Sequence, residues 1–239
     1  MKKLKLICSA IAAFGLLALA GCDLEISDSS KVEYAESNIE DVSGIPFYYD
    51  GRLLYNTQVA ACESITETTG ASISLMYKLS ALKTDNTFEW ESPLKISDKD
   101  EKNVIWIDFG PLGIWLAGGG VNFFEGEAKD ANGNNGDWTA FCQTGDPVCM
   151  TVSFNVDGTI SYYKDGVLAF TFSGSKESVN VADGCKQAIK NIAENGFIVH
   201  ATHNSDKSYE TSYLCIDAAV DDAKAKEIAT TLIAKYNSN

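Results

Sequence analysis

Two Asp-Gly dipeptides divide the stretch from Met150 to Phe172 into three short segments. Apolar and polar residues alternate within these segments, which is the pattern of strands with one buried face. Asp157-Gly158 and Asp165-Gly166 can each supply the two positive φ angles that a type I′ hairpin requires. The stretch is therefore predicted to fold as a meander of three antiparallel strands.

The same alternation recurs at Ser72–Lys78 and at Ile105–Phe109, and each run predicts a strand that is half-buried on one face. Gly118-Gly119-Gly120 predicts a hairpin turn between strands at Gly113–Ala117 and Val121–Glu125. The sequence therefore predicts a mainly β domain.

Two helices are predicted within this β pattern. Asp183 can cap the first helix, and Asn195-Gly196 can end it. The apolar face of this helix comprises Cys185, Ala188, Ile189, Ile192 and Ala193. The second helix begins at Asp221-Asp222 and carries Lys235 near its end. Its apolar stripe, which we expect to dock on a sheet, comprises Ala225, Ile228, Ala229, Leu232, Ile233 and Tyr236.

Four segments resemble the concanavalin A-like, or laminin-G-like, jelly roll. They are the early strand Ser72–Lys78, the meander Val152–Leu168, the closing strand Tyr213–Val220 and the helix Ala225–Tyr236. The helix predicted at Asp183 departs from the family pattern, in which a loop or a strand is usual there. The resemblance implies an antiparallel two-sheet jelly-roll sandwich with one inserted helix and a C-terminal helix. It also implies a module that binds glycans or proteins, in some members together with Ca²⁺.

The N-terminus resembles a bacterial lipoprotein signal peptide. Three lysines precede the apolar stretch Leu6–Leu19, and Leu19-Ala20-Gly21-Cys22 resembles the lipobox. The apolar stretch is shorter than the about 20 residues of a transmembrane helix. The resemblance implies removal of residues 1–21, acylation of Cys22 with chains such as palmitate, and attachment to a membrane of the bacterial cell envelope. It leaves open whether the protein occupies the periplasmic side of a membrane or the cell surface.

The remaining chain divides into an acidic, serine-containing tether at residues 22–44 and one domain at residues 45–239. The whole chain has 19 Lys plus Arg and 33 Asp plus Glu, for a net charge of -14. Removing the three lysines of the signal peptide, which contains no acidic residue, leaves a net charge near −17. Such a surface repels nucleic acid and anionic lipid, and it attracts cations such as Ca²⁺.

Cysteine usage fits an oxidising compartment. The cysteines beyond Cys22 are Cys62, Cys142, Cys149, Cys185 and Cys215. Cys142 and Cys149 flank a short turn-rich stretch and are the first candidate disulfide. The second candidate disulfide joins Cys185 to Cys215, although Cys62 can equally pair with Cys215. No Cys-x-x-Cys pair occurs, which argues against a structural zinc site.

The best local candidate for a ligand site is the loop from Gly126 to Trp138. Its candidate binding residues are Asp130, Asn134, Asn135, Asp137 and Trp138. Oxygen ligands suit Ca²⁺, and an aromatic ring beside amides suits a sugar. Asn, Gly and Asp are also ordinary turn residues, so a purely structural loop remains open. The EF-hand spacing is not met.

An enzyme is the alternative class, because jelly rolls of this shape include polysaccharide hydrolases and lyases. Glu125 and Glu127 would lie on one side of a strand, at a spacing of about 6–7 Å that falls between the retaining and inverting separations. The Glu-x-Asp-x-x-Glu and Gln-x-His motifs of such enzymes are absent, and His200 and His203 lie in no recognisable catalytic motif. A free Cys185 near a helix N-terminus would have a lowered pKa, but a disulfide is favoured there. No catalytic residue is assigned, and a non-catalytic binding module is preferred.

A structural or interaction lipoprotein of the envelope is the third possibility. Trp106, Trp115 and Phe124 are the aromatic residues that could form its contact surface, whereas aromatic residues in alternating strands are by default buried in the core.

Overall fold

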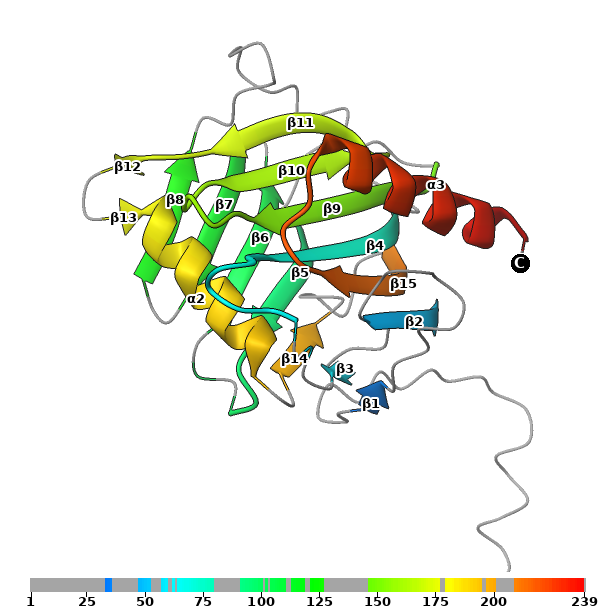
Figure 1. Ribbon diagram of the computed structural model, residues 1–239, viewed down its shortest axis with the longest axis horizontal. Coiled ribbons are helices and arrows are strands. Elements are labelled where there is room, and N and C mark those ends of the chain that lie inside the picture. The colour runs from blue at the N-terminus through cyan, green and yellow to red at the C-terminus, as the bar shows by residue number, and fades with distance from the viewer. Residues whose placement is uncertain are drawn as a thin grey trace, which may run out of the picture.

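The computed structural model describes residues 33–35, 47–52, 57–59, 62, 64–79, 91–100, 102, 104–110, 113–118, 121–126, 146–176, 179–194, 197–200 and 209–238. These residues form two large β-sheets and two helices (Figure 1). The strands of one sheet lie behind those of the other in this view and run across them. The predicted mainly β, two-sheet antiparallel sandwich with two helices is confirmed.

Sheet A has seven strands within the described residues, in the spatial order β1-β3-β14-β5-β6-β7-β8. Their bounds are Glu33–Ala35, Thr57–Val59, Phe197–His200, Glu91–Ser97, Val104–Gly110, Gly113–Gly118 and Val121–Gly126. Neighbouring strands are antiparallel, except that β1 runs parallel to β3. The glycine-turned hairpin of β7 and β8 is confirmed. β1 lies within the segment predicted as a tether.

Sheet B has six strands, in the spatial order β11-β10-β9-β4-β15-β2. Their bounds are Val167–Phe172, Ile160–Lys164, Val148–Phe154, Ala71–Leu79, Tyr209–Asp217 and Phe47–Arg52. The short strands β12 (Ser175–Lys176) and β13 (Val179–Asn180) pair separately. The predicted meander is therefore confirmed as β9, β10 and β11, and β4 and β15 extend the same sheet.

The two Asp-Gly turns of the meander differ in geometry. Asp165 and Gly166 both have positive φ, 51° and 76°, so the type I′ prediction is confirmed there. In the first turn only Gly158 has a positive φ, of 82°, so the type I′ prediction for Asp157-Gly158 is wrong. The Asp157 carboxylate accepts hydrogen bonds from the Thr159 N–H (2.9 Å) and hydroxyl (2.7 Å). These bonds hold Asp157 in the ordinary φ region and lower its pKa.

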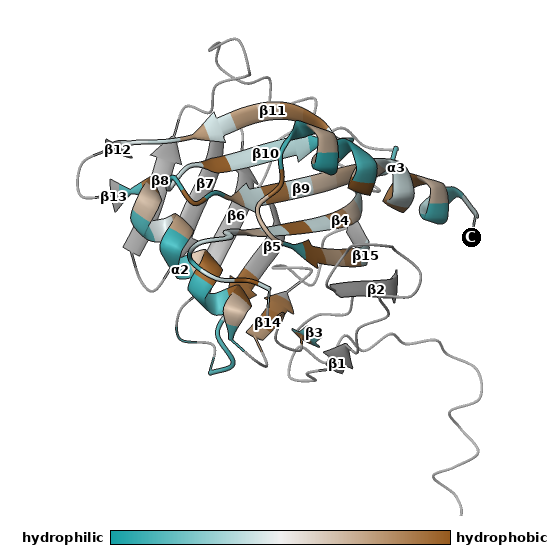
Figure 2. Ribbon diagram, in the orientation of Figure 1, coloured by the Kyte–Doolittle hydropathy of each residue, from teal (hydrophilic) through white to brown (hydrophobic). Residues whose placement is uncertain are grey.

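An inner core fills the space between the sheets. Sheet B contributes Ile73, Leu75, Val152, Phe154, Tyr162, Phe170 and Leu214, and sheet A contributes Val59, Ile96, Phe197 and Val199. Helix α2 (Val181–Ala193) adds Val181, Cys185, Ala188, Ile189 and Ile192. Helix α2 therefore belongs to the layer between the sheets, with its polar residues turned outward (Figure 2).

The N-cap of α2 is Asn180 rather than the predicted Asp183. The Asn180 side-chain oxygen accepts a hydrogen bond from the Ala182 N–H at 2.9 Å. The helix begins earlier than predicted because Val181, its first residue, packs in the core and is fully buried. Ala193, which was predicted on the apolar face, is exposed at the end of the helix.

Helix α3 (Asp222–Ser238) covers the other face of sheet B. Its buried residues are Ala225, Ile228, Ala229 and Leu232, with Ile233 and Tyr236 packed beside them. They contact an outer core on the sheet that comprises Met76, Cys149, Tyr163, Tyr213 and Cys215. The predicted docking of this helix is confirmed. Among the described residues, neither helix is long and apolar enough to cross a membrane.

Strand β4 is buried on both faces, which corrects the prediction of a half-buried strand. Ile73 and Leu75 face the inner core, while Ser74 and Met76 lie under α3 and are 0% and 1% exposed. The buried Ser74 hydroxyl accepts a hydrogen bond of 2.8 Å from the Thr151 hydroxyl. The small polar residues of the alternation thus lie on a face that a helix covers. Their burial is tolerated because the hydroxyl groups form hydrogen bonds with each other.

We predict that Gly166→Ala destabilises the protein more than Gly174→Ala. Both glycines have positive φ, 76° and 83°, so each alanine would be strained by about 1–2 kcal/mol. A Cβ at residue 166 would also lie 2.6 Å from the Lys226 Cα of α3, whereas one at residue 174 meets nothing within 4 Å. Urea unfolding should show an additional loss of about 1–3 kcal/mol for Gly166→Ala. Equal losses for the two variants would contradict the close contact between this turn and α3.

Candidate functional site

The loop predicted to bind a ligand lies outside the described residues. This holds for Asp130, Asn134, Asn135, Asp137 and Trp138, and also for Cys22, Glu127 and His203. The proposals for these residues remain predictions. Four of the residues singled out from the sequence lie in described strands of sheet A. They are Trp106, Trp115, Phe124 and Glu125.

The register of sheet A separates its core face from the opposite face. Ile96 of β5 is fully buried in the inner core and pairs with Ile105 of β6. Register partners share a face of a sheet, and successive residues of a strand alternate between faces. Trp106 and Asp108 therefore occupy the face opposite to the core.

An acidic residue is paired with Trp115 on each side. Trp115 of β7 is the register partner of Asp108 in β6 and of Glu125 in β8. Directly paired residues have Cβ atoms about 4.5–5.5 Å apart. Asp108 and Glu125 therefore occupy positions about 10 Å from each other, with Trp115 between them.

A second row crosses the same face one step along the strands. Trp106 pairs with Lys95 of β5 and with Ala117 of β7. Ala117 pairs in turn with Asn122 of β8, and Lys95 pairs with His200 of β14. His200, predicted to lie in no catalytic motif, is thus the neighbour of a lysine at the end of this row.

The two rows place Trp106 and Trp115 at diagonal positions on adjacent strands. Such diagonal neighbours are about 7–8 Å apart. We name this group the tryptophan face and define it as Lys95, Trp106, Asp108, Trp115, Asn122 and Glu125. These six residues thus occupy register positions on one side of sheet A.

Phe124 does not belong to the tryptophan face. It pairs with Leu116 of β7, which pairs with Ile107 of β6. Ile107 alternates with Trp106, so all three residues of this row are on the core side. The register therefore separates the three aromatic residues that the sequence grouped together.

Neither described helix packs on the tryptophan face. Helix α2 contributes to the inner core, and α3 contacts β9, β4 and β11 of sheet B. Figure 1 shows α2 in front of the β5–β8 strands and α3 beside the strands of sheet B. Helices therefore pack on sheet B, whereas no described helix covers the second face of sheet A, where Ser97 and Ile198 are nevertheless buried, at 0% and 3% exposed.

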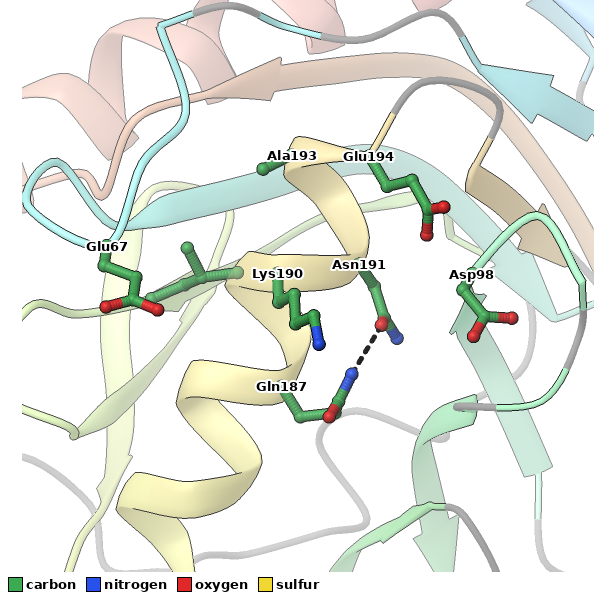
Figure 3. A pocket seen from close by; sticks show the side chains of 8 residues that line it. Glu67, Asp98, Gln187, Lys190, Asn191, Ala193 and Glu194 are labelled. Carbon is green, nitrogen blue, oxygen red and sulfur yellow. Dashed lines mark hydrogen bonds between the residues drawn. The ribbon is translucent and has the colours of Figure 1, made fainter.

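A polar hollow of about 470 Å³ lies along α2 (Figure 3). It is lined by Glu67, Asp98, Gln187, Ile189, Lys190, Asn191, Ala193 and Glu194. Glu67 and Asp98 lie on opposite sides of the helix, and Lys190 projects between them. The lining contains carboxylates, amides and an amine but no aromatic residue.

Four of the polar residues that line this hollow, Asp98, Gln187, Asn191 and Glu194, bond to protein groups nearby. Gln187 Nε2 donates a 2.8 Å hydrogen bond to the Oδ1 atom of Asn191, a residue that is 1% exposed. Asp98 accepts one from the Lys102 N–H at 2.8 Å. Lys99 and Glu194 form an ion pair of 3.2 Å with side chains 54% and 37% exposed, so its contribution is small. Of these contacts, only the Lys99–Glu194 ion pair joins the end of α2 to the segment that follows β5.

The predicted disulfide between Cys185 and Cys215 is wrong. Both are free thiols, as are Cys62 and Cys149. The predicted bridge between Cys142 and Cys149 and the alternative bridge between Cys62 and Cys215 are therefore wrong as well, although Cys142 itself lies outside the described part of the chain. Cys185 belongs to the inner core and Cys215 to the outer core, on opposite faces of sheet B. The sheet itself thus separates the two sulfur atoms.

Burial makes these thiols poor nucleophiles. It raises the pKa of Cys62 to about 11 and those of Cys149 and Cys185 to about 12, and it raises that of Cys215 well above its usual value. The expected lowering of the Cys185 pKa by the helix N-terminus is therefore wrong, since desolvation outweighs it. The Cys185 thiol instead donates to the Asn155 carbonyl oxygen at 3.3 Å and ties α2 to the meander.

Metal-binding capacity is limited in the described ranges. There, no group of three or more His, Cys, Asp and Glu residues is placed to hold a metal ion. The Ca²⁺ prediction concerns the loop from residue 126 to 138, most of which lies outside those ranges, and it remains a prediction.

Comparisons with known proteins do not assign the chain to a family. No family model and no curated protein matches its sequence. Three similar solved structures illustrate the level of likeness. The binding domain of botulinum neurotoxin serotype D is 14% identical with a TM-score of 0.44, over 78% of this chain and 40% of that one. The binding domain of Paraclostridial Mosquitocidal Protein 1 is 13% identical with a TM-score of 0.36, over 78% and 45%.

Trypanosoma rangeli sialidase is the third, at 6% identity and a TM-score of 0.40, over 80% of this chain and 28% of that one. This chain therefore spans less than half the length of each of these proteins. All three similarities are too low to transfer a function.

We predict that the four described thiols resist alkylation in the native protein at pH 8. Buried thiols with raised pKa values hold almost no thiolate at this pH, and thiolate is the reactive form. Mass spectrometry after iodoacetamide treatment should find them unmodified in the folded chain and modified in guanidinium chloride. The variant used would carry Cys8→Ser, Cys22→Ser and Cys142→Ser. Rapid native alkylation, or a disulfide among the four, would contradict the structure.

Proposed function

We propose that this chain is a lipid-anchored protein of the bacterial cell envelope. Its concanavalin A-like domain would bind a glycan or protein ligand on the tryptophan face, without catalysis. The lipobox-like sequence at Cys22 supports the anchor, and the confirmed two-sheet sandwich is compatible with the domain type. Whether the anchor lies in the inner or the outer membrane is left open.

The anchor would hold the sandwich near the bilayer. Residues 23–32 separate Cys22 from the start of β1 at Glu33. Ten extended residues span at most about 36 Å, which limits the distance between the membrane and this edge of sheet A. The domain would thus act on ligands close to the membrane surface that carries it.

The observation that carries the binding proposal is the row Asp108–Trp115–Glu125 beside Trp106. An aromatic ring provides apolar contact area, and neighbouring carboxylate and amide groups fix the orientation of a polar ligand. Tryptophan is also enriched among residues that dominate protein interfaces. The charge of the chain, -14 overall, disfavours nucleic acid as the ligand.

A polysaccharide-degrading enzyme is a second candidate, favoured by one observation. Asp108 and Glu125 are both register partners of Trp115, so two acidic residues lie two strands apart on one face, and such hydrolases use a pair of acidic residues that flank the scissile bond. Turnover of a polysaccharide that Glu125→Gln abolishes while binding persists would establish this activity. Binding without turnover would leave the non-catalytic function in place.

We predict that Trp115→Ala weakens ligand binding at least about tenfold, because one well-placed aromatic contact contributes more than 1.4 kcal/mol. The full chain in detergent would be tested on a glycan array and on solubilised envelope proteins. Val167→Ala is the matched control, since it also removes apolar surface from a strand, at a residue that is 67% exposed.

Thermal unfolding would establish that both variants fold. Binding that is unchanged in Trp115→Ala would contradict the tryptophan face as the site. Binding that is lost on calcium chelation and in Trp138→Ala would place the site in the loop from residue 126 to 138 instead.

A further inference from the structure

We infer that the polar hollow along α2 binds a free basic amino acid. The carboxylate of the ligand would contact Lys190, and its two cationic groups would lie toward Asp98 on one side and Glu67 on the other. The hollow is separate from the tryptophan face, so this second site does not depend on the ligand proposed there.

The hollow lies over α2 between two segments that flank the helix. Figure 3 shows Glu67, from the turn before β4, on one side of α2 and Asp98, from the segment after β5, on the other. The volume of about 470 Å³ falls within the about 300–1,000 Å³ that is usual for small-molecule sites. The hollow is therefore large enough for a small polar molecule.

Two charged groups of the lining are available to a ligand. Glu67 and Lys190 are exposed, and neither forms a hydrogen bond or an ion pair with a described residue. Lys190 projects between Glu67 and Asp98. The hollow thus presents one positive group between two negative ones.

Polar groups held by burial contribute acceptors beside Lys190. Asn191 is 1% exposed, and its Oδ1 atom accepts from Gln187 Nε2 at 2.8 Å, which fixes the Gln187 amide and leaves Oε1 as an acceptor. Asp98 is 9% exposed and accepts from the Lys102 N–H. Because an ionised carboxylate has about four acceptor sites, Asp98 can accept from a ligand as well.

The spacing along the helix suits an α-amino acid. Gln187 and Lys190 are three residues apart on α2, so their Cβ atoms are neighbours at about 5–6 Å. In an α-amino acid a single carbon atom joins the ammonium to the carboxylate, so one such pair can contact Gln187 and Lys190 together. The side chain of the ligand would then extend across the helix toward Glu67.

The balance of charges favours a basic side chain. Three carboxylates and one amine line the hollow, and one of the carboxylates, that of Glu194, pairs with Lys99. A basic amino acid carries two positive groups and one negative group, which complement Asp98, Glu67 and Lys190. An acidic amino acid would be repelled by Glu67, and a diamine would place a positive charge against Lys190 without a carboxylate to offset it.

Isothermal titration calorimetry on the full chain in detergent, at about 0.15 M salt, would test the ligand class. The probes are L-lysine, L-arginine, L-alanine, L-glutamate and cadaverine. At least one of the two basic amino acids should bind. The other three probes should each bind at least about tenfold more weakly, because each lacks one of the three charges that the hollow complements.

Variants at exposed positions would assign the contacts. Lys190→Gln should weaken binding of the basic amino acid at least about tenfold without weakening that of cadaverine. Glu67→Gln should remove the preference for a basic amino acid over L-alanine. Lys186→Gln is the matched control, because Lys186 is an exposed lysine of the same helix outside the lining. Thermal unfolding would establish that the three variants fold.

Three results would overturn the inference. They are the absence of binding for both basic amino acids, cadaverine binding as tight as theirs, and equal losses of affinity in Lys190→Gln and Lys186→Gln. Trp115→Ala should leave binding of the basic amino acid unchanged. The site on α2 and the proposed function of the tryptophan face can therefore fail independently of each other.

Discussion

Burial of sheet B on both faces is the constraint on which the rest of the structure depends. Strand β4 lies in its centre between β9 and β15, with Ile73 and Leu75 toward sheet A and Met76 toward α3. The small hydroxyl residues on the helix-covered face make this possible. Thr151 bonds to Ser74, and the Ser153 hydroxyl accepts the Val220 N–H just before α3 begins. Because these polar groups are satisfied, the sheet can carry a helix without an unpaired buried donor.

This arrangement makes the two sheets unequal. Sheet B is the structural centre, since both of its faces and the meander turn at Gly166 are in contact with other elements. Sheet A packs against the inner core through residues such as Ile96 and Phe197, and Ser97 and Ile198 of its other face are also buried, at 0% and 3% exposed. A residue changed in the centre of sheet B, such as Ile73 or Met76, therefore disturbs a core.

Local features were predictable from the sequence, and non-local ones were not. Asp165-Gly166 fixes its turn within two residues, and the stripe of α3 depends only on helical spacing, so both predictions were confirmed. The cap of α2 was misplaced because Asn180 and Asp183 are equally good caps, and only the burial of Val181 decides between them. The predicted bridge between Cys185 and Cys215 was wrong because sheet B lies between the two cores that contain them. The rows of sheet A join strands that are distant in sequence, such as β5 and β14, so alternation alone could not separate Trp106 from Phe124.

Strand β1 has a mechanical consequence if Cys22 is anchored as proposed. It is joined to sheet A by only three register pairs with β3, and it lies at the edge opposite to β8, one of the strands that carry the tryptophan face. A pulling force between a ligand bound there and the membrane would pass across the whole width of the sheet and load this short edge strand. Detachment of β1 would lengthen the link to the membrane while the two cores stayed closed. The edge strand would then act as an extensible element that yields before the binding domain unfolds.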